Sequence, residues 1–491
     1  MNKKKFTRRQ FLHSSGVVMV GASTILAGCS GSDKKAEPTP PTPPEPAPTP
    51  PPVDDELNIT PQNKSLVFIM LDGGNDSFNM LVPTTTGTYN DYKNSRGDLS
   101  IARNKLLPLN GFTDSNNKSF GLHPSLPKTK ALFEESKLAF VANIAPLIEP
   151  VTKSEFVAGS KPLPVGLMSH SDQFKHWQTS RPSERINDGW FGAFADVLQK
   201  SKADNAISMN ISLAGSNIMQ NGKEAREYAV TKDGSVGLKV KQNDNPNLRA
   251  LNDVLSGGFD KMLAVNYSTA FPKTYIDGIS HAQAQHETFK AAIDKINVST
   301  DFKSQNGQES DLASQLKMVA KSIAASGDLG MQQQTFFVRY IGWDHHSELL
   351  NNHKGMLTVL DDALSAFQTA LKELGIEDKV VTFTGSDFGR SLTSNGSGTD
   401  HGWGGNTLVM GQDVDGGKIY GEYPEITLGN ANPLDVGGGV FIPTTATDEL
   451  YAELALWFGV DKNDLPKLFP NLGNFYDVTK PEAPLGVLKL S

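Results

Sequence analysis

The chain has 491 residues, and its hydrophobic content of 38% and charged content of 20% suit a globular protein with a sizeable core. The formal charge is −8, which argues against a nucleic-acid partner, because binding to phosphates needs a basic face. The only cysteine is Cys29, which excludes an internal disulfide bond and a metal site built from cysteine ligands.

Residues 1–29 have the organisation of a signal peptide. The pair Arg8 and Arg9, followed by Phe-Leu, predicts export by the twin-arginine translocase, which carries folded proteins. The apolar run at 16–27 has about half of the roughly 20 residues that span a bilayer, so it is typical of a signal and not of a transmembrane helix. Cleavage before Cys29 would remove five basic and no acidic residues, changing the charge from −8 to −13.

The end of this segment, Leu-Ala-Gly-Cys at 26–29, resembles a lipobox, in which the thiol of Cys29 receives a diacylglyceryl group. The alternative is a plain cleaved signal with an incidental cysteine, but the only cysteine of the chain lies at this position. We therefore expect lipoprotein-processing enzymes and the membrane itself as partners. This places the protein in the cell envelope, on the periplasmic or outer-surface side, and Ser30 in place of an aspartate favours the outer membrane.

A proline-rich linker, 30–63, separates the signal from a globular domain predicted at 64–491. The segment 36–52 is AEPTPPTPPEPAPTPPP, which cannot form a helix or a sheet ladder because proline lacks the amide donor. A polyproline chain rises about 3.1 Å per residue, so the linker would hold the domain away from the membrane. A proline motif that docks a partner is the alternative and needs more assumptions.

Continuous apolar runs predict buried strands of a parallel sheet. They lie at 66–71, 138–142, 336–341 and 380–384. Leucines and a phenylalanine spaced by three and four residues over 357–374 predict a helix between the last two runs, so this part is a βαβ unit. Further helices are predicted at 312–325 and 448–458, the latter with Thr447 as its N-cap. The fold class is therefore α/β, a doubly wound and mostly parallel sheet with helices on both faces.

Three of these strands end in a carboxylate. Asp72, Asp344 and Asp387 follow the first, third and fourth runs in glycine-containing loops. Ligands of such sheets bind outside the carboxyl ends of the strands, so these side chains are expected to share one site.

Imidazoles accompany the carboxylates. Asp344 precedes His345 and His346, and Asp400 precedes His401. Oxygen and nitrogen ligands together suit a divalent metal such as zinc or manganese, and one or two ions could be held. Each His-Asp pair alone could instead be a surface hydrogen-bonded pair.

Two further residues have candidate catalytic roles. Ser169 precedes a predicted helix through Trp177, where free amides and the helix dipole would favour an alkoxide nucleophile. A plain N-cap serine is the alternative. Arg390 could bind an oxyanion through two nitrogens or form a structural ion pair. His123 and His176 are interpreted as structural.

The ordered set LDGGND, SHSDQ, GWDHH, TGSDFGR and TDHGWGG resembles the family called domain of unknown function 1501, over roughly 64–480. That family is similar to the alkaline phosphatase-like superfamily of phosphatases, phosphomutases and sulfatases. The resemblance implies a doubly wound sheet, one or two metals and a nucleophilic serine, which would be Ser169. It also implies five metal ligands, namely Asp72, Asp344, His346, Asp387 and His401.

The sequence departs from the superfamily in three places. Phe388 follows Asp387 where a histidine is usual, so a second metal would lack an imidazole. His346 lies two positions after Asp344, where a spacing of four is common in phosphatases, and the sulfatase signature around a Cys or Ser nucleophile is missing. The sequence thus predicts a metal-dependent hydrolase of phosphate or sulfate esters, with an unknown substrate. The alternative is a catalytically inactive superfamily member that acts as an envelope binding or assembly protein.

Overall fold

The computed structural model describes residues 56–200, 206–238, 245, 248–265, 268–304 and 306–490. The predicted signal, with Arg8, Arg9 and Cys29, lies outside the described residues, as does the linker up to residue 55. Described contacts begin earlier than the predicted domain start at Lys64. Leu57 is buried and Ile59 forms a bridge with Val460, so the last part of the predicted linker packs on the domain.

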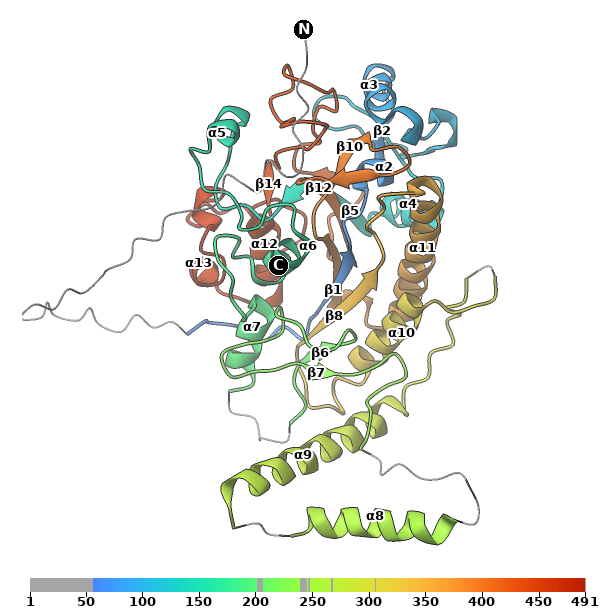
Figure 1. Cartoon of the computed structure of the whole chain (residues 1–491), viewed down its shortest axis with the longest axis vertical. Helices are drawn as coiled ribbons and strands as arrows, with labels where there is room; N and C mark the ends of the chain where they lie inside the picture. The colour runs from blue at the N-terminus through green and yellow to red at the C-terminus, as the bar shows by residue number, and fades with distance from the viewer. Residues whose placement is uncertain are drawn as a thin grey trace, which may run out of the picture. The chain divides into compact units, whose positions relative to one another are not determined.

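A nine-stranded sheet forms the centre of the described part of the chain (Figure 1). Its strand order is β13-β5-β12-β9-β1-β8-β6-β7, and β14 pairs with β5. The strands are β1 (Ser65–Asp72), β5 (Leu138–Ala145), β6 (Asn210–Ser212), β7 (Tyr228–Ala229), β8 (Gln334–Ile341), β9 (Val380–Ser386), β12 (Gly405–Gly411), β13 (Ile419–Tyr420) and β14 (Thr445–Ala446).

The four apolar runs are confirmed as strands β1, β5, β8 and β9. β1 lies between β8 and β9 and pairs with both in parallel, so the connection from β8 to β9 crosses over β1. β12 is antiparallel to both of its neighbours, while the other pairings of the sheet are parallel. The predicted mostly parallel class is therefore confirmed.

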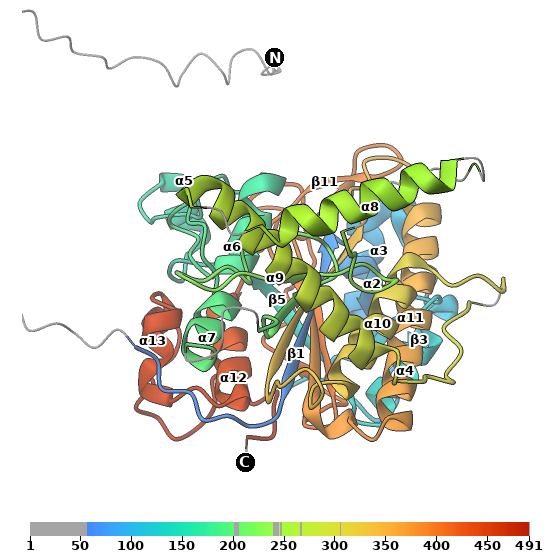
Figure 2. The same cartoon turned by 90° about the horizontal axis from the view of Figure 1, so that it is seen from below.

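Helices cover both faces of the sheet (Figures 1 and 2). Side chains of a strand point alternately to the two faces. In β1, Val67 and Ile69 pack in the core with α10 (Asp311–Ala324) and α11 (Leu349–Glu373). Phe68 packs on the other face, with α7 (Trp190–Leu198) and α12 (Thr447–Phe458). Burial on both faces explains why these strands are apolar without interruption.

The remaining elements lie around this sheet. The other helices with four or more residues are α2 (Ser77–Met80), α3 (Thr86–Arg96), α4 (Pro127–Glu134), α5 (Lys153–Ala158), α6 (His170–Thr179), α8 (Arg249–Leu263), α9 (Ala270–Ile293) and α13 (Leu465–Leu468). Two small sheets consist of β10 (Arg390–Ser394) with β11 (Thr399–His401), and of β2 (Leu81–Pro83), β4 (Phe120–Leu122) and β3 (Leu107–Pro108).

Two predicted helix starts are corrected. Thr447 is the first residue of α12 and Ala446 is the N-cap, whose amide donates to Glu449 Oε2 at 2.8 Å. α11 begins at Leu349, about two turns before the predicted stripe, because Asn351, Asn352 and Lys354 interrupt the apolar spacing in its first turns.

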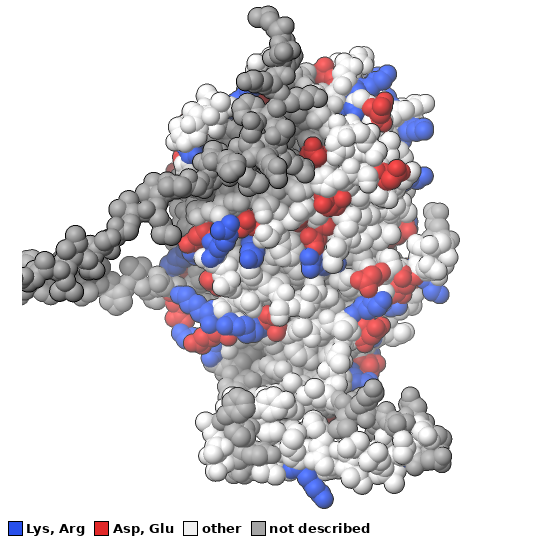
Figure 3. All heavy atoms as spheres, in the orientation of Figure 1, with Lys and Arg blue, Asp and Glu red and all other residues white. Residues whose placement is uncertain are grey.

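Helices α8 and α9 carry an unusual share of the exposed apolar side chains. Leu251, Val254 and Leu255 of α8 and Tyr275 of α9 are exposed. The face drawn in Figure 3 shows few charged side chains over this pair, whereas acidic and basic side chains are mixed over the rest of that face. Among the described residues, no helix combines the length and apolar character needed to cross a bilayer.

Candidate metal centre

The ends of β1, β8 and β9 bring the three predicted aspartates to one edge of the sheet. The parallel register pairs Leu71 with Ser386, so Asp72 and Asp387 follow side by side. The backbone carbonyl of Asp72 accepts from the amides of Gly342 and Trp343, both at 3.1 Å, so the loop after β8 lies against the end of β1. This contact places Asp344 beside the other two.

A glycine makes this close approach possible. Gly73 has a φ of +123°, and a Cβ built on it would lie 2.6 Å from the backbone nitrogen of Asp344. A side chain at this position would push the loop after β8 away from β1, and a positive φ is itself costly for residues other than glycine.

The hairpin of β10 and β11 brings His401 to Asp344. Arg390 and His401 are cross-strand partners, and Nη1 of Arg390 donates to Asp344 Oδ1 at 2.6 Å. The amide of Thr399 donates to the carbonyl of His345 at 3.2 Å, so the hairpin also binds the backbone of the loop after β8. Clusters more than fifty residues apart in the sequence therefore converge.

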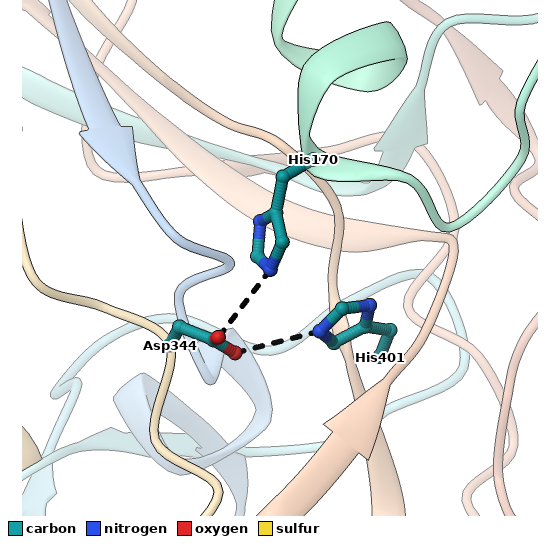
Figure 4. A group of neighbouring side chains, drawn as sticks. All are labelled: His170, Asp344 and His401. Carbon is teal, nitrogen blue, oxygen red and sulfur yellow. Dashed lines mark ion pairs between the residues drawn. The ribbon is translucent and has the colours of Figure 1, made fainter.

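Four donor groups meet at this point. Asp344 Oδ1 lies 3.0 Å from Nε2 of His346 and 3.5 Å from Nε2 of His401, and these two nitrogens are 3.1 Å apart. Asp344 Oδ2 lies 3.4 Å from Nε2 of His170, the first residue of α6. Figure 4 shows His170, from α6, and His401, from β11, pointing at the carboxylate of Asp344. His170, Asp344 and His401 offer ligand atoms within 4.8 Å of one another.

Each imidazole has an acceptor behind it. Nδ1 of His170 lies 2.6 Å from Asp387 Oδ2, Nδ1 of His401 lies 2.9 Å from the carbonyl of Met168, and Nδ1 of His346 faces Asp400 Oδ1 at 3.6 Å. A proton on Nδ1 leaves a lone pair on Nε2, directed at the cluster. Ligand histidines are commonly oriented by such a second contact.

The electrostatics of the cluster favour the ligating forms of two donors. The hydrogen bond to Asp387 raises the pKa of His170, and burial raises the pKa of Asp387 itself. Burial lowers the pKa of His401. Partial burial by itself would raise the pKa of Asp344, but the hydrogen bond and charge of Arg390 outweigh it and lower that pKa. At neutral pH, Asp344 is therefore an anion and His401 a neutral imidazole, as metal ligation requires.

The arrangement fits a divalent metal. Tetrahedral zinc with bonds of 2.0–2.1 Å has its ligand atoms about 3.3 Å apart. Asp344 Oδ1 and the Nε2 atoms of His346 and His401 lie 3.0–3.5 Å apart, close to this value, and Nε2 of His170 lies 3.4 Å from the other oxygen of Asp344. In addition, Nε2 of His170 is buried and has no hydrogen-bond partner among the described residues, which a metal bond would satisfy.

One known protein family matches most of this chain. The sequence profile of the proteins of unknown function DUF1501 matches residues 63–466. The chain belongs to the DUF1501 family. The sequence matches no curated protein.

Three solved structures have similar chains. Ps i-CgsB is 11% identical, with a TM-score of 0.33, and the match covers 85% of this chain and 78% of that one. The lipoteichoic acid synthase LtaP from Listeria monocytogenes is 7% identical, with a TM-score of 0.30 and 79% of each chain covered. The PsFucS1 sulfatase from Pseudoalteromonas sp. is 12% identical, with a TM-score of 0.29, covering 74% and 65%.

In this DUF1501 protein, two further predicted ligands, Asp72 and Asp387, lie around the cluster, and Asp72 pairs with Arg339. Its Oδ2 accepts from Nε of Arg339 at 2.6 Å. Asp387 contacts Nδ1 of His170 and not the donor atoms of the cluster, so it orients a ligand. The structure thus brings Asp344, His346 and His401 into direct contact, with Asp72 and Asp387 around them.

The two candidate catalytic residues have contrasting surroundings. Ser169 is the N-cap position of α6, but its hydroxyl makes no capping bond and lies 3.2 Å from Ser171 Oγ. Arg390 is buried, and its Nε and Nη2 bind Thr399 while its Nη1 binds Asp344. All three guanidinium nitrogens are engaged. Arg390 therefore forms a structural ion pair, which was the alternative to binding an oxyanion.

No role was predicted for His170, although the motif SHSDQ contains it. Its partner Asp387 lies 217 positions along the chain, so no local spacing indicates the pair. His353 was also missed. It is buried in α11, and its Nε2 contacts Asn75 Oδ1 at 2.9 Å. His123 and His176, interpreted as structural, are both buried.

Proposed function

We propose that this DUF1501 protein is a metal-dependent hydrolase of phosphate or sulfate esters at the cell envelope. One observation carries the proposal, the convergence of three imidazoles on the carboxylate of Asp344, with donor distances of 3.0–3.5 Å and an acceptor behind each Nδ1. This donor set favours zinc or manganese.

The metal would be held by Asp344, His346, His401 and His170. When bound, such an ion stabilises the negative charge that develops on an ester oxygen. Arg390 holds the carboxylate of Asp344 in place, and Asp387 fixes the ring of His170 and keeps its Nδ1 protonated. Both residues therefore act by positioning the ligands.

Ser169 is the proposed nucleophile. It stands between Met168, whose carbonyl binds His401, and His170, so its backbone is fixed on both sides by the cluster. Its place as the N-cap residue of α6 sets it at the positive end of the helix dipole, which favours an anionic oxygen. The attack would form a bond from Ser169 Oγ to phosphorus or sulfur and break the bond to the alcohol oxygen, which leaves as the alcohol with the proton of the serine hydroxyl. Water would then cleave the serine ester, releasing phosphate or sulfate and restoring the hydroxyl.

A catalytically silent binding protein is the second candidate. The observation that favours it is the pairing of Asp72 with Arg339 and of Asp344 with Arg390, which compensates both carboxylates without a metal. Phe388 also packs its ring against His170 and His401, with centroids 4.7 and 4.4 Å apart, where a second metal would need a donor.

Hydrolysis of p-nitrophenyl phosphate and p-nitrophenyl sulfate separates the two candidates. The zinc-loaded protein should hydrolyse one of them, and Ser169→Ala and His401→Ala should each reduce kcat at least 100-fold. Ser160→Ala, an exposed serine, is the matched control. A protein that binds zinc but hydrolyses neither ester would favour the silent candidate, and full activity of Ser169→Ala would remove it as the nucleophile.

The envelope location is part of the proposal and rests on the sequence. Cys29→Ser should move the protein from the membrane pellet to the soluble periplasmic fraction, because acyl chains hold it at about 0.8 kcal/mol per buried methylene. Replacing Arg8 and Arg9 with lysine should leave precursor in the cytoplasm. Pelleting of Cys29→Ser after a high-salt wash would contradict the anchor.

A further inference from the structure

Arg339 is a cation at the same edge of the sheet with unused hydrogen-bond donors. Its Nε and Nη2 bind Asp72 Oδ2, and Nη1 has no hydrogen-bond partner among the described residues. The side chain is 37% exposed, whereas that of Arg390 is 0% exposed and fully engaged. One edge of the Arg339 guanidinium therefore remains available to a ligand from solvent.

Two contacts hold this guanidinium in a fixed orientation. Asp72 binds one edge, and Cζ lies 5.0 Å from the centre of the Phe174 ring, within the range of a cation–π contact. A guanidinium bound at one edge and stacked on a ring loses little further freedom when its other edge binds an anion.

The ring of Phe174 relates Arg339 to the metal centre. Phe174 and His170 are four residues apart on α6, so they lie on the same side of that helix. Asp72 stands next to Asp387 in the strand register, and Asp387 binds His170. Arg339 thus flanks the cluster on the side of α6 that carries His170.

We propose that Arg339 is the anion-binding residue of this site and holds two non-bridging oxygens of a tetrahedral oxyanion. This inference rests on the proposed function and makes it more specific. A planar fork of N–H donors matches a phosphoryl or sulfuryl group, whose oxygens carry delocalised charge, better than the single oxygen of a carboxylic ester or amide. The substrate is therefore an ester whose acid part keeps at least one negative charge.

Calorimetric titration of the zinc-loaded protein with inorganic phosphate and with sulfate tests the proposal. Arg339→Met should weaken binding of the preferred anion about tenfold or more, as expected for loss of a charge-assisted pair of hydrogen bonds, with an unchanged zinc content. Arg339→Lys should retain the ion pair with Asp72 and the melting temperature, yet bind the anion several-fold more weakly, because it lacks the fork. Arg103→Met removes an exposed arginine that lies 6.0 Å from the ring of Tyr89 and is the control.

Unchanged anion affinity in both Arg339 variants, with zinc retained, would overturn the proposal. Loss of zinc or of folding in Arg339→Lys would also overturn it, because Arg339 would then have a structural role. Failure of the proposed function gives a different result, because the wild-type protein would then bind no stoichiometric zinc or would bind zinc and hydrolyse neither p-nitrophenyl ester. In that case, the same titration of metal-free protein still shows whether Arg339 binds the anion.

Discussion

At the scale of single residues, metal binding depends on the groups that orient the ligands. Asp387 is buried, and its Oδ2 lies 2.6 Å from Nδ1 of His170. A carboxylate in this position fixes the tautomer and raises the basicity of the imidazole. Its contribution should therefore appear in metal affinity even though it would not touch the ion.

Asp387→Asn should weaken zinc binding by about 10- to 100-fold, because an amide keeps the shape of the carboxylate but loses its charge. Competition with a zinc chelator of known affinity measures the change. Asp328→Asn, which replaces an exposed carboxylate paired with Lys295, is the control and should leave the affinity unchanged. An Asp387→Asn protein with wild-type zinc affinity would contradict the role given to Asp387.

Asp448, which lies outside the candidate metal centre, should make the stability of the fold depend on pH. Burial raises the pKa of Asp448 to about 7, against the opposing hydrogen bond from Ser180 Oγ at 2.6 Å. The folded state then holds a proton that the unfolded state has lost above its usual pKa near 4. The contribution of Asp448 to stability is therefore present at low pH and is lost as the pH rises from about 4 to about 7.

Asp448→Asn can still accept the bond from Ser180 but does not titrate. Its free energy of unfolding should fall less between pH 5 and pH 8 than that of the wild type, by an amount on the order of a few kcal/mol. Urea unfolding at several pH values measures this difference. Parallel pH profiles of the two proteins would show that Asp448 is ionised in the folded state.

At the scale of elements, the turn after β1 determines how closely the loop after β8 approaches. Gly73→Ala should cost about 2–3 kcal/mol of stability and weaken zinc binding, because the added Cβ would lie 2.6 Å from the backbone of Asp344. Gly111→Ala is a matched control with a φ of +76° and no atom within 4 Å of the added Cβ. It should lose only about 1 kcal/mol and bind zinc normally, as measured by thermal unfolding and zinc titration. Equal effects of both substitutions would contradict the close-contact explanation.

Some strands of the central sheet could be predicted from the sequence and others could not. The strands β1, β5, β8 and β9 were predicted because burial on both faces requires continuous apolar runs. Strand β12 was not predicted, because it is a short run with Gly405 and Gly411 at its ends and resembles a loop. Its antiparallel direction depends on neighbours far along the chain.

Part of the candidate site could also be predicted from the sequence. The ends of the predicted strands gave Asp72, Asp344 and Asp387, because parallel strands end at one edge. The hairpin from Arg390 to His401 and the role of His170 could not be predicted. Both depend on pairings between distant segments, which a local motif does not indicate.

At the scale of the whole molecule, the metal would connect parts of the chain that are distant in sequence. The proposed ligands come from α6, from the loop after β8 and from β11. The unfolded chain has no preformed site, so binding favours the folded state by RT ln(1 + [L]/Kd), about 4 kcal/mol at a thousandfold excess over Kd. Removal of the metal should therefore affect the entire domain.

Chelation should lower the melting temperature of the wild type by about 4 °C, since for a domain of this size 1 kcal/mol corresponds to roughly 1 °C. His401→Ala should lose most of this sensitivity. Differential scanning calorimetry with and without chelator measures both shifts. An equal decrease in the two proteins would locate any stabilising metal outside the cluster.

Anomalous diffraction from zinc-soaked crystals, recorded at the zinc edge, shows directly whether His170, Asp344, His346 and His401 bind a metal. We expect one strong peak, with Nε2 of His170, His346 and His401 and an oxygen of Asp344 at about 2.0–2.2 Å. A peak elsewhere, or no peak in a protein that remains folded, would contradict the proposed metal centre and the function derived from it.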